Sequence, residues 1–142
     1  MNRARSATAL LLVSCFLAGC GYFMAGSWED DPKNFNRVFG YSPPEGVEVV
    51  HSLYTRFPHW SHEHVFYLHF SAPNEFVREL IDRNDLNLSE QIWSRPEDGP
   101  GWFPAGSTSE YEVWSQAGSP SSGLVLLKHR ETVEVFLYDR QV

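Results

Sequence analysis

The stretch VEVVHSLYTRF, residues 47–57, decides the fold class because its side chains alternate between two faces. One face carries Val47, Val49, His51, Leu53, Thr55 and Phe57. Such alternation, with several β-branched residues, is typical of a half-buried strand. Residues 58–61 (PHWS) break the pattern, and residues 62–70 are expected to form a second strand. The sequence therefore predicts a β-hairpin.

A helix is predicted directly after this hairpin, over residues 73–84. Its apolar residues recur at helical spacing and form one stripe; they are Phe76, Val77, Leu80 and Ile81. Glu79 and Arg83 stand four residues apart, where opposite charges stabilise a helix. A shorter helix is expected before the hairpin, with Asp31 as its cap and Gly40 at its end.

The C-terminal third predicts three more strands, near residues 110–116, 124–129 and 132–139. The expected fold class is α+β. It is a single antiparallel sheet of about five strands in the order strand-strand-helix-strand-strand-strand. The main helix is expected to pack on one face of this sheet, and a short helix is expected near the N-terminus of the domain. Residues 31–142 are expected to form this single domain.

The N-terminal segment has the features of an export signal. Arg3 and Arg5 are followed by the apolar residues 7–16, a stretch too short to span a bilayer. It ends in Leu17-Ala18-Gly19-Cys20. These four residues resemble the lipobox of bacterial lipoprotein signal peptides, in which one aliphatic and two small residues precede a cysteine. The resemblance covers residues 1–20 and leaves the domain behind it unrecognised.

The resemblance implies that Cys20 is the lipidation site and that residues 1–19 are a signal peptide removed before it. Residues 20–30 would then be a lipidated tether, and the membrane would be bound through lipid on Cys20. Gly21 stands where an aspartate would favour retention in the inner membrane. By this resemblance the protein is expected at the outer membrane, facing the periplasm. Cys15 would be removed with the signal, so the mature domain would keep no free thiol.

The charge of the chain excludes one class of partner. The formal net charge is -7, and loss of Arg3 and Arg5 leaves 9 basic and 18 acidic residues, a net charge of -9. A surface this acidic repels phosphates, so no nucleic acid partner is expected. It also disfavours an electrostatic attachment to anionic lipid, which leaves the acyl chains as the attachment.

Histidines are the candidate metal ligands. His59, His62 and His64 lie close together in the sequence, and His51 precedes them. Two imidazoles two residues apart on a strand point to one face and can chelate zinc or copper. The spacing matches no common zinc motif, so these residues are weak candidates. Polar histidines at an exposed hairpin end are the alternative, and no metal or other cofactor is expected.

Tryptophans are numerous for this length, with 5 in 142 residues. Trp93 and Trp114 are expected in the core. Trp60, Trp102 and Phe103 fall in predicted loops, where residues that bind partners are often found. These three are the candidate partner-binding residues, with a role in the core as the alternative for the two tryptophans.

No catalytic motif is present: there is no nucleophile elbow and no phosphate-binding glycine loop, and the mature domain would have no thiol nucleophile. The expectation is a protein that is not an enzyme. The leading hypothesis is a non-catalytic module that binds or scaffolds an envelope protein partner. The alternatives are a periplasmic immunity or inhibitor protein, and a lipoprotein that binds a small ligand or metal through the region of His51, His59, His62 and His64.

Overall fold

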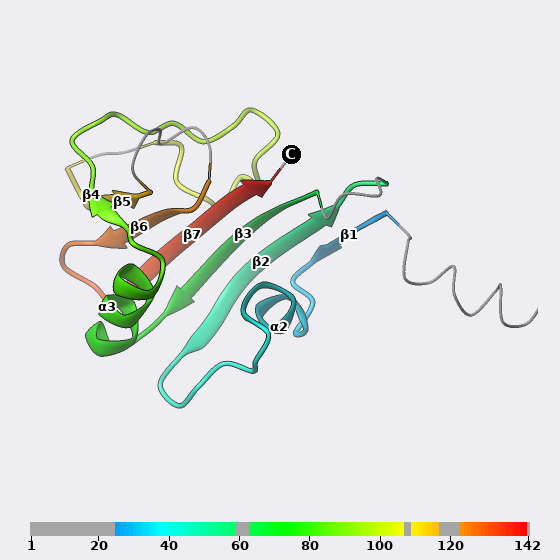
Figure 1. Cartoon of the computed structure of the whole chain (residues 1–142), viewed down its shortest axis with the longest axis horizontal. Helices are drawn as coiled ribbons and strands as arrows, with labels where there is room; N and C mark the ends of the chain where they lie inside the picture. Colours follow the sequence, from blue (N-terminus) through cyan, green and yellow to red (C-terminus); the bar gives the residue numbers. More distant parts are fainter. Residues whose placement is uncertain (1–24, 59–62, 107–108, 117–122, 142) are drawn as a thin grey trace, which may run out of the picture.

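The fold is one antiparallel sheet with two helices on one of its faces (Figure 1). The computed structural model describes residues 25–58, 63–106, 109–116 and 123–141. Within these residues the sheet has seven strands in the order β1-β2-β3-β7-β6-β5-β4. The strands are β1 (Gly26–Glu29), β2 (Glu48–Arg56), β3 (His64–Ser71), β4 (Asn87–Leu88), β5 (Tyr111–Ser115), β6 (Val125–His129) and β7 (Glu134–Gln141). The helices are α2 (Asn34–Phe39) and α3 (Asn74–Arg83).

Most of the predicted elements are confirmed. Strands β2 and β3 form the predicted hairpin, and β5, β6 and β7 form the predicted antiparallel meander. Helix α3 follows the hairpin and carries the predicted ion pair between Glu79 and Arg83. Gly40 ends α2 in the left-handed conformation, at φ 78°, which glycine adopts without strain.

The predicted number of strands is wrong, because the sheet has seven strands rather than about five. The two missed strands, β1 and β4, are its outermost members and have four and two residues. Strands this short show no recognisable alternation. They form because neighbouring strands β2 and β5 offer unpaired backbone groups to them.

Strand β1 also corrects the expected extent of the tether. Residues 20–30 were assigned to a tether, but Gly26–Glu29 pairs with β2, with Gly26 opposite Arg56 and Glu29 opposite Leu53. The carboxylate of Asp30 then accepts a hydrogen bond of 2.9 Å from the backbone N–H of Ser52. The sheet therefore includes residues 26–29, which the sequence had assigned to the tether.

A β-bulge changes which residues of β2 share a face. The register shifts between Val49 and His51, because Val49 lies opposite Phe70 and His51 opposite His69. Val50 is the extra residue and is exposed. Simple alternation put Val49 and His51 on one face, and the bulge separates them. Val49 packs against the helices, and His51 lies on the opposite face.

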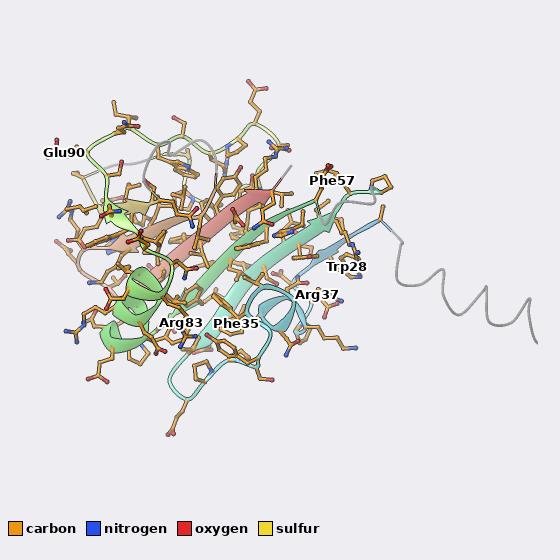
Figure 2. All side chains as sticks on the ribbon, in the orientation of Figure 1. Trp28, Phe35, Arg37, Phe57, Arg83 and Glu90 are labelled. Carbon is orange, nitrogen blue, oxygen red and sulfur yellow. The ribbon has the colours of Figure 1, made fainter. Side chains whose placement is uncertain are left out.

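The two faces of the sheet bury two separate clusters. The helix side, covered by α2 and α3, contains alternate residues of β3 and β7 with the stripe of α3; its buried members include Phe66, Leu68, Phe70, Val77, Leu80, Ile81, Val135 and Leu137. The loop side contains Val65, Tyr67, Trp93, Phe103, Val113, Val125, Leu127, Phe136 and Tyr138. Phe35 of α2, labelled in Figure 2, is buried on the helix side. Its ring contacts that of Phe70 edge-on.

The loop between β4 and β5 covers the loop side of the sheet. Trp93 and Phe103 are its buried members. The Arg95 guanidinium holds the loop in shape, because its Nη1 donates to the carbonyl oxygens of Pro100 and Phe103, both at 2.6 Å. This loop therefore covers the loop side of the sheet, as α2 and α3 cover the helix side.

Asn34 links three elements through one buried amide. Its Nδ2 donates to the carbonyl oxygen of Trp28 on β1 at 2.8 Å and to Ser52 Oγ on β2 at 3.0 Å. Its Oδ1 accepts a hydrogen bond of 2.6 Å from Arg37 on α2. The residue is 0% exposed, so water cannot replace these partners.

Asn34→Ala is therefore expected to lower the free energy of unfolding by about 2–3 kcal/mol, because it leaves buried polar groups without partners. Urea denaturation followed by circular dichroism measures the change. Asn36→Ala, at an exposed position of the same helix, is the control and should cost less than about 1 kcal/mol. Equal losses in the two variants would contradict a bridging role for Asn34.

Candidate ligand-binding cavity

The predicted histidine set is not brought together among the described residues. His51 and His64 lie on opposite faces of the hairpin, His51 on the loop side and His64 on the helix side. His59, His62 and Trp60 lie outside the described residues. The described part of the chain contains no group of three or more His, Cys, Asp or Glu side chains that could hold a metal ion. The hypothesis of a metal site gains no support from these residues.

His51 instead belongs to a stacked arrangement on the loop side. Its ring stacks on Trp102 with centroids 5.3 Å apart, and its Nδ1 lies 3.3 Å from Asp30 Oδ2. His69 lies opposite His51 on β3, and its Nε2 lies 3.3 Å from Oε1 of Glu134 on β7. Burial lowers the pKa of His69, and the hydrogen bond with Glu134 opposes that shift. The neutral ring of His69 is thus favoured in the folded protein.

The assignment of Phe103 as a partner-binding residue is a prediction that its burial contradicts. Phe103 is 1% exposed and contacts Tyr67 and Trp93 edge-on in the loop-side cluster. It has no surface to offer a partner in this fold. Trp102 is half-buried against His51, and Trp93 lies in the core as predicted.

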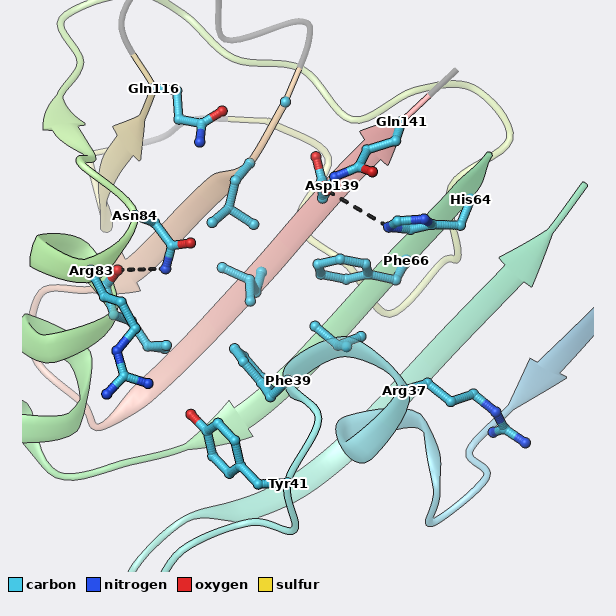
Figure 3. Close-up of a pocket in the computed structure, with 15 residues that line it drawn as sticks. Arg37, Phe39, Tyr41, His64, Phe66, Arg83, Asn84, Gln116, Asp139 and Gln141 are labelled. Carbon is cyan, nitrogen blue, oxygen red and sulfur yellow. Dashed lines mark hydrogen bonds and ion pairs between the residues drawn. The ribbon is translucent and has the colours of Figure 1, made fainter. Parts of the chain in front are cut away.

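A cavity lies on the helix side, between α2 and α3 and above β3, β7 and the segment just before β6 (Figure 3). Its volume is about 530 Å³, within the range of small-molecule sites. We call it the helix-side cavity. Its lining residues are Arg37, Val38, Phe39, Tyr41, His64, Phe66, Leu80, Arg83, Asn84, Gln116, Gly123, Leu124, Leu137, Asp139 and Gln141.

The floor and one wall of this cavity are apolar. Phe66 of β3 and Leu137 of β7 are almost completely buried and belong to the helix-side core. The floor is in place because alternate residues of both strands face the helices. Phe39 and Tyr41 supply aromatic rings from the end of α2 and the segment after it, with centroids 5.8 Å apart. The half-buried rings of Phe39 and Tyr41 are apolar surface that the body of a small ligand could contact.

One end of the cavity is polar and centres on a buried carboxylate. Asp139 is 6% exposed, although it lies on the same face of β7 as Leu137. Its Oδ2 accepts a hydrogen bond of 3.2 Å from Gln141 Nε2 and lies 3.9 Å from His64 Nε2. Burial raises the pKa of the Asp139 carboxyl, while the His64 ring and the Gln141 amide act in the opposite direction.

Two arginines line the cavity, and both already have acidic partners. Arg37 Nη1 lies 2.9 Å from Asp31 Oδ2, and Arg83 pairs with Glu79. The pKa of Asp31 is lowered by its hydrogen bond from the backbone of Lys33 and by Arg37. In Figure 3 the side chains of Arg37 and Arg83 reach away from Asp139. The two positive charges are therefore balanced outside the cavity.

Sequence reasoning missed Asp139, although a signal was present. In residues 134–141 (EVFLYDRQ) the inward positions of one face are Val135, Leu137 and Asp139. An ionisable residue that continues an apolar face is unusual, since isolated charges are expensive to bury. The alternation alone could have marked Asp139 as a functional candidate.

The described lining of the cavity holds few of the groups used in nucleophilic chemistry. Its described lining contains no serine, threonine, cysteine or lysine, and Tyr41 is the single hydroxyl. His64 and Asp139 could exchange a proton, but they have no nucleophile beside them in this lining. The lining offers apolar contact, ring faces and one carboxylate, which are the elements of a recognition site.

Replacing Asp139 with asparagine is expected to change how stability depends on pH. A carboxyl whose pKa is raised on folding binds its proton more tightly in the native state, so stability falls as pH rises from about 3.8 through the folded pKa. The Asp139→Asn variant has no carboxyl at this position, so it does not lose stability in this way as the pH rises. The stability advantage of the variant should therefore grow with pH in that window and then stay constant, at about 1.4 kcal/mol per unit of pKa shift. Urea denaturation between acidic and neutral pH measures it, and a difference independent of pH would contradict the burial argument.

Comparisons with known proteins identify no relative for this chain. No protein-family model matches the sequence, and no curated protein and no solved structure gives a significant match. None of the helices among the described residues is long and apolar enough to cross a membrane. Cys20 lies outside the described residues.

Proposed function

We propose that the protein is a lipid-anchored binding module of the bacterial cell envelope, which holds a small ligand in the helix-side cavity without transforming it. The observation that carries this proposal is Asp139, a carboxylate 6% exposed at the end of a cavity of about 530 Å³. An asparagine or leucine would avoid the cost of burying a charge at this position. A charge placed where a ligand can reach it is better explained by recognition than by stability.

The place of action follows from the lipobox resemblance at Leu17-Ala18-Gly19-Cys20. We propose lipid on Cys20, removal of residues 1–19, and a location at the outer membrane facing the periplasm. The acidic charge of the chain supports attachment through acyl chains instead of through basic residues. Nucleic acid is not among the proposed ligands, for the same electrostatic reason.

The cavity is tested by blocking it. Gln141 lies at the exposed end of β7 and lines the cavity, so Gln141→Trp places an indole across the polar end. Gln91→Trp adds the same side chain at an exposed position outside the cavity. A library of small polar and amphipathic compounds is screened for compounds that raise the Tm of the full chain.

Ligands of the cavity should raise the Tm of the parent chain and of Gln91→Trp, and should not raise that of Gln141→Trp. Compounds that raise the Tm of all three proteins equally would place the site elsewhere. A library in which no compound stabilises the parent chain would contradict the proposed binding function.

A protein partner is the second candidate, favoured by the outer edge of the sheet at β4. Leu88 on β4 is 58% exposed, and Ile92 just after it is 85% exposed. Exposed apolar side chains beside an open strand edge are a common docking surface. An inhibitor that binds a basic protein would fit the acidic charge of the chain. Loss of binding to a co-purified envelope protein in Leu88→Ser with Ile92→Ser would support this candidate.

A further inference from the structure

A row of aromatic rings crosses the helix side and ends at Asp139. The strand register aligns four residues in this row, from β1 to β7: Trp28, Tyr54, Phe66 and Asp139. His64 lies beside the row and stacks on both neighbouring rings. Its centroid is 5.7 Å from that of Tyr54 and 6.0 Å from that of Phe66. The surface that leads to the carboxylate is thus made of ring faces.

This row already accommodates a cation within the molecule. The Arg37 guanidinium lies over the ring of Trp28, 4.7 Å from its centroid, and the two side chains lie together in Figure 2. The face of an aromatic ring is electron-rich and attracts cations at such distances. Phe39, Tyr41 and Phe66 bring further rings into the cavity itself.

Asp139 has no full counter-charge among the described residues. No lysine or arginine of the described chain forms an ion pair with it, and the His64 ring at 3.9 Å is charged only when protonated. A buried carboxylate with this incomplete environment gains most from a cationic ligand, because ion pairing offsets the cost of its burial. A hydrogen-bond donor without charge would offset less.

The remaining charges disfavour an anionic ligand. Arg37 and Arg83, the cavity's two arginines, are paired with Asp31 and Glu79. An anion would therefore meet the Asp139 carboxylate without a free positive charge to oppose it. The net charge of -7 also attracts cations and repels anions over longer distances.

We propose that the helix-side cavity binds a small amphipathic organic cation, with its ammonium group at the Asp139 end of the cavity and its apolar body along the half-buried rings of Phe39 and Tyr41. This inference rests on the proposed binding function and specifies its ligand class. Asp139 is then the main residue that determines specificity for charge, the aromatic ring faces add to the preference for a cation, and their apolar surface supplies affinity for the body of the ligand.

The test compares three small probes of similar size and different charge: n-butylammonium, n-butanol and butanoate. The full chain, in a neutral detergent, is titrated with each probe, and the amide NMR signals of Phe66 and Leu137 are followed. We expect n-butylammonium to bind roughly tenfold more tightly than n-butanol, and butanoate to bind most weakly. Asp139→Asn should greatly reduce the preference for the ammonium and leave the affinity for n-butanol within about twofold.

Asp98→Asn is the matched control, because it makes the same change in net charge at an exposed carboxylate that pairs with Arg140 outside the cavity. It should keep the preference for the ammonium. A parent chain that binds n-butanol or butanoate as tightly as n-butylammonium, or a preference unchanged in Asp139→Asn, would overturn the proposed ligand class. The cavity would still be a binding site if uncharged ligands bind the parent chain and Gln91→Trp but not Gln141→Trp. No binding by these probes or by any library compound would reject both proposals.

Discussion

Phe103→Ala is expected to lower the free energy of unfolding by about 3–5 kcal/mol, one of the largest effects available to a single substitution in this chain. The ring is 1% exposed. It contacts four aromatic rings, those of Tyr67, Trp93, Trp102 and Phe136, with centroids 5.2 to 5.9 Å away. Truncation to alanine removes all of these contacts and leaves a cavity that such a tightly packed cluster cannot close.

Urea denaturation measures this loss, and Trp102→Ala is its neighbouring control. Trp102 is half-buried and stacks on His51 at the edge of the same cluster, so its loss should cost less than that of Phe103. If Trp102→Ala proved the more destabilising variant, the loop between β4 and β5 would not be held mainly by Phe103. Unchanged stability in Phe103→Ala would place that residue outside the core.

Cys20→Ser is expected to abolish lipid labelling completely, since the thiol is the acceptor of the acyl groups in the lipobox resemblance. The variant should be lost from the outer-membrane fraction. A single acyl chain gives only about 10⁴ M⁻¹ of membrane binding, and stable anchoring takes more than one, so loss of them all removes the attachment. Growth with radiolabelled palmitate, followed by membrane fractionation, measures both effects.

Cys15→Ser is the matched control, because Cys15 lies in the segment that the lipobox resemblance assigns to the removed signal. It should keep the label and the location of the parent chain. Label that persists in Cys20→Ser, or disappears in Cys15→Ser, would contradict the assignment of the lipid to Cys20.

The sequence predicted the elements whose pattern is long and regular. Residues 47–57 alternate over eleven positions, and the helix after Pro73 repeats its apolar residues at the correct spacing, so both were recognised. Strands β1 and β4 were missed because pairing with β2 and β5 creates them. The bulge at Val50 was missed because no local residue type marks it, and it becomes visible only in the register with β3.

The candidate site could be predicted only in part. The polarity of His64 was noticed, but its partner Asp139 lies 75 residues further along the chain and is brought beside it by pairing of β3 with β7. Phe103 was placed in a loop, as the structure has it, and was taken for a surface residue because loops are usually exposed. Here the loop covers one face of the sheet, so its apolar residues are core residues.

The early start of β1 has a consequence for how far the domain can travel. Five residues separate Cys20 from Gly26. An extended chain spans at most about 3.6 Å per residue, so Gly26 can lie at most roughly 20 Å from Cys20. With lipid on Cys20, the start of β1 would stay within about this distance of the membrane surface. If the ligand is an amphipathic cation that partitions to the membrane surface, holding the domain there raises the concentration of ligand that its cavity meets. A weak site would then be well occupied at the membrane surface at bulk concentrations that would leave a freely diffusing domain empty.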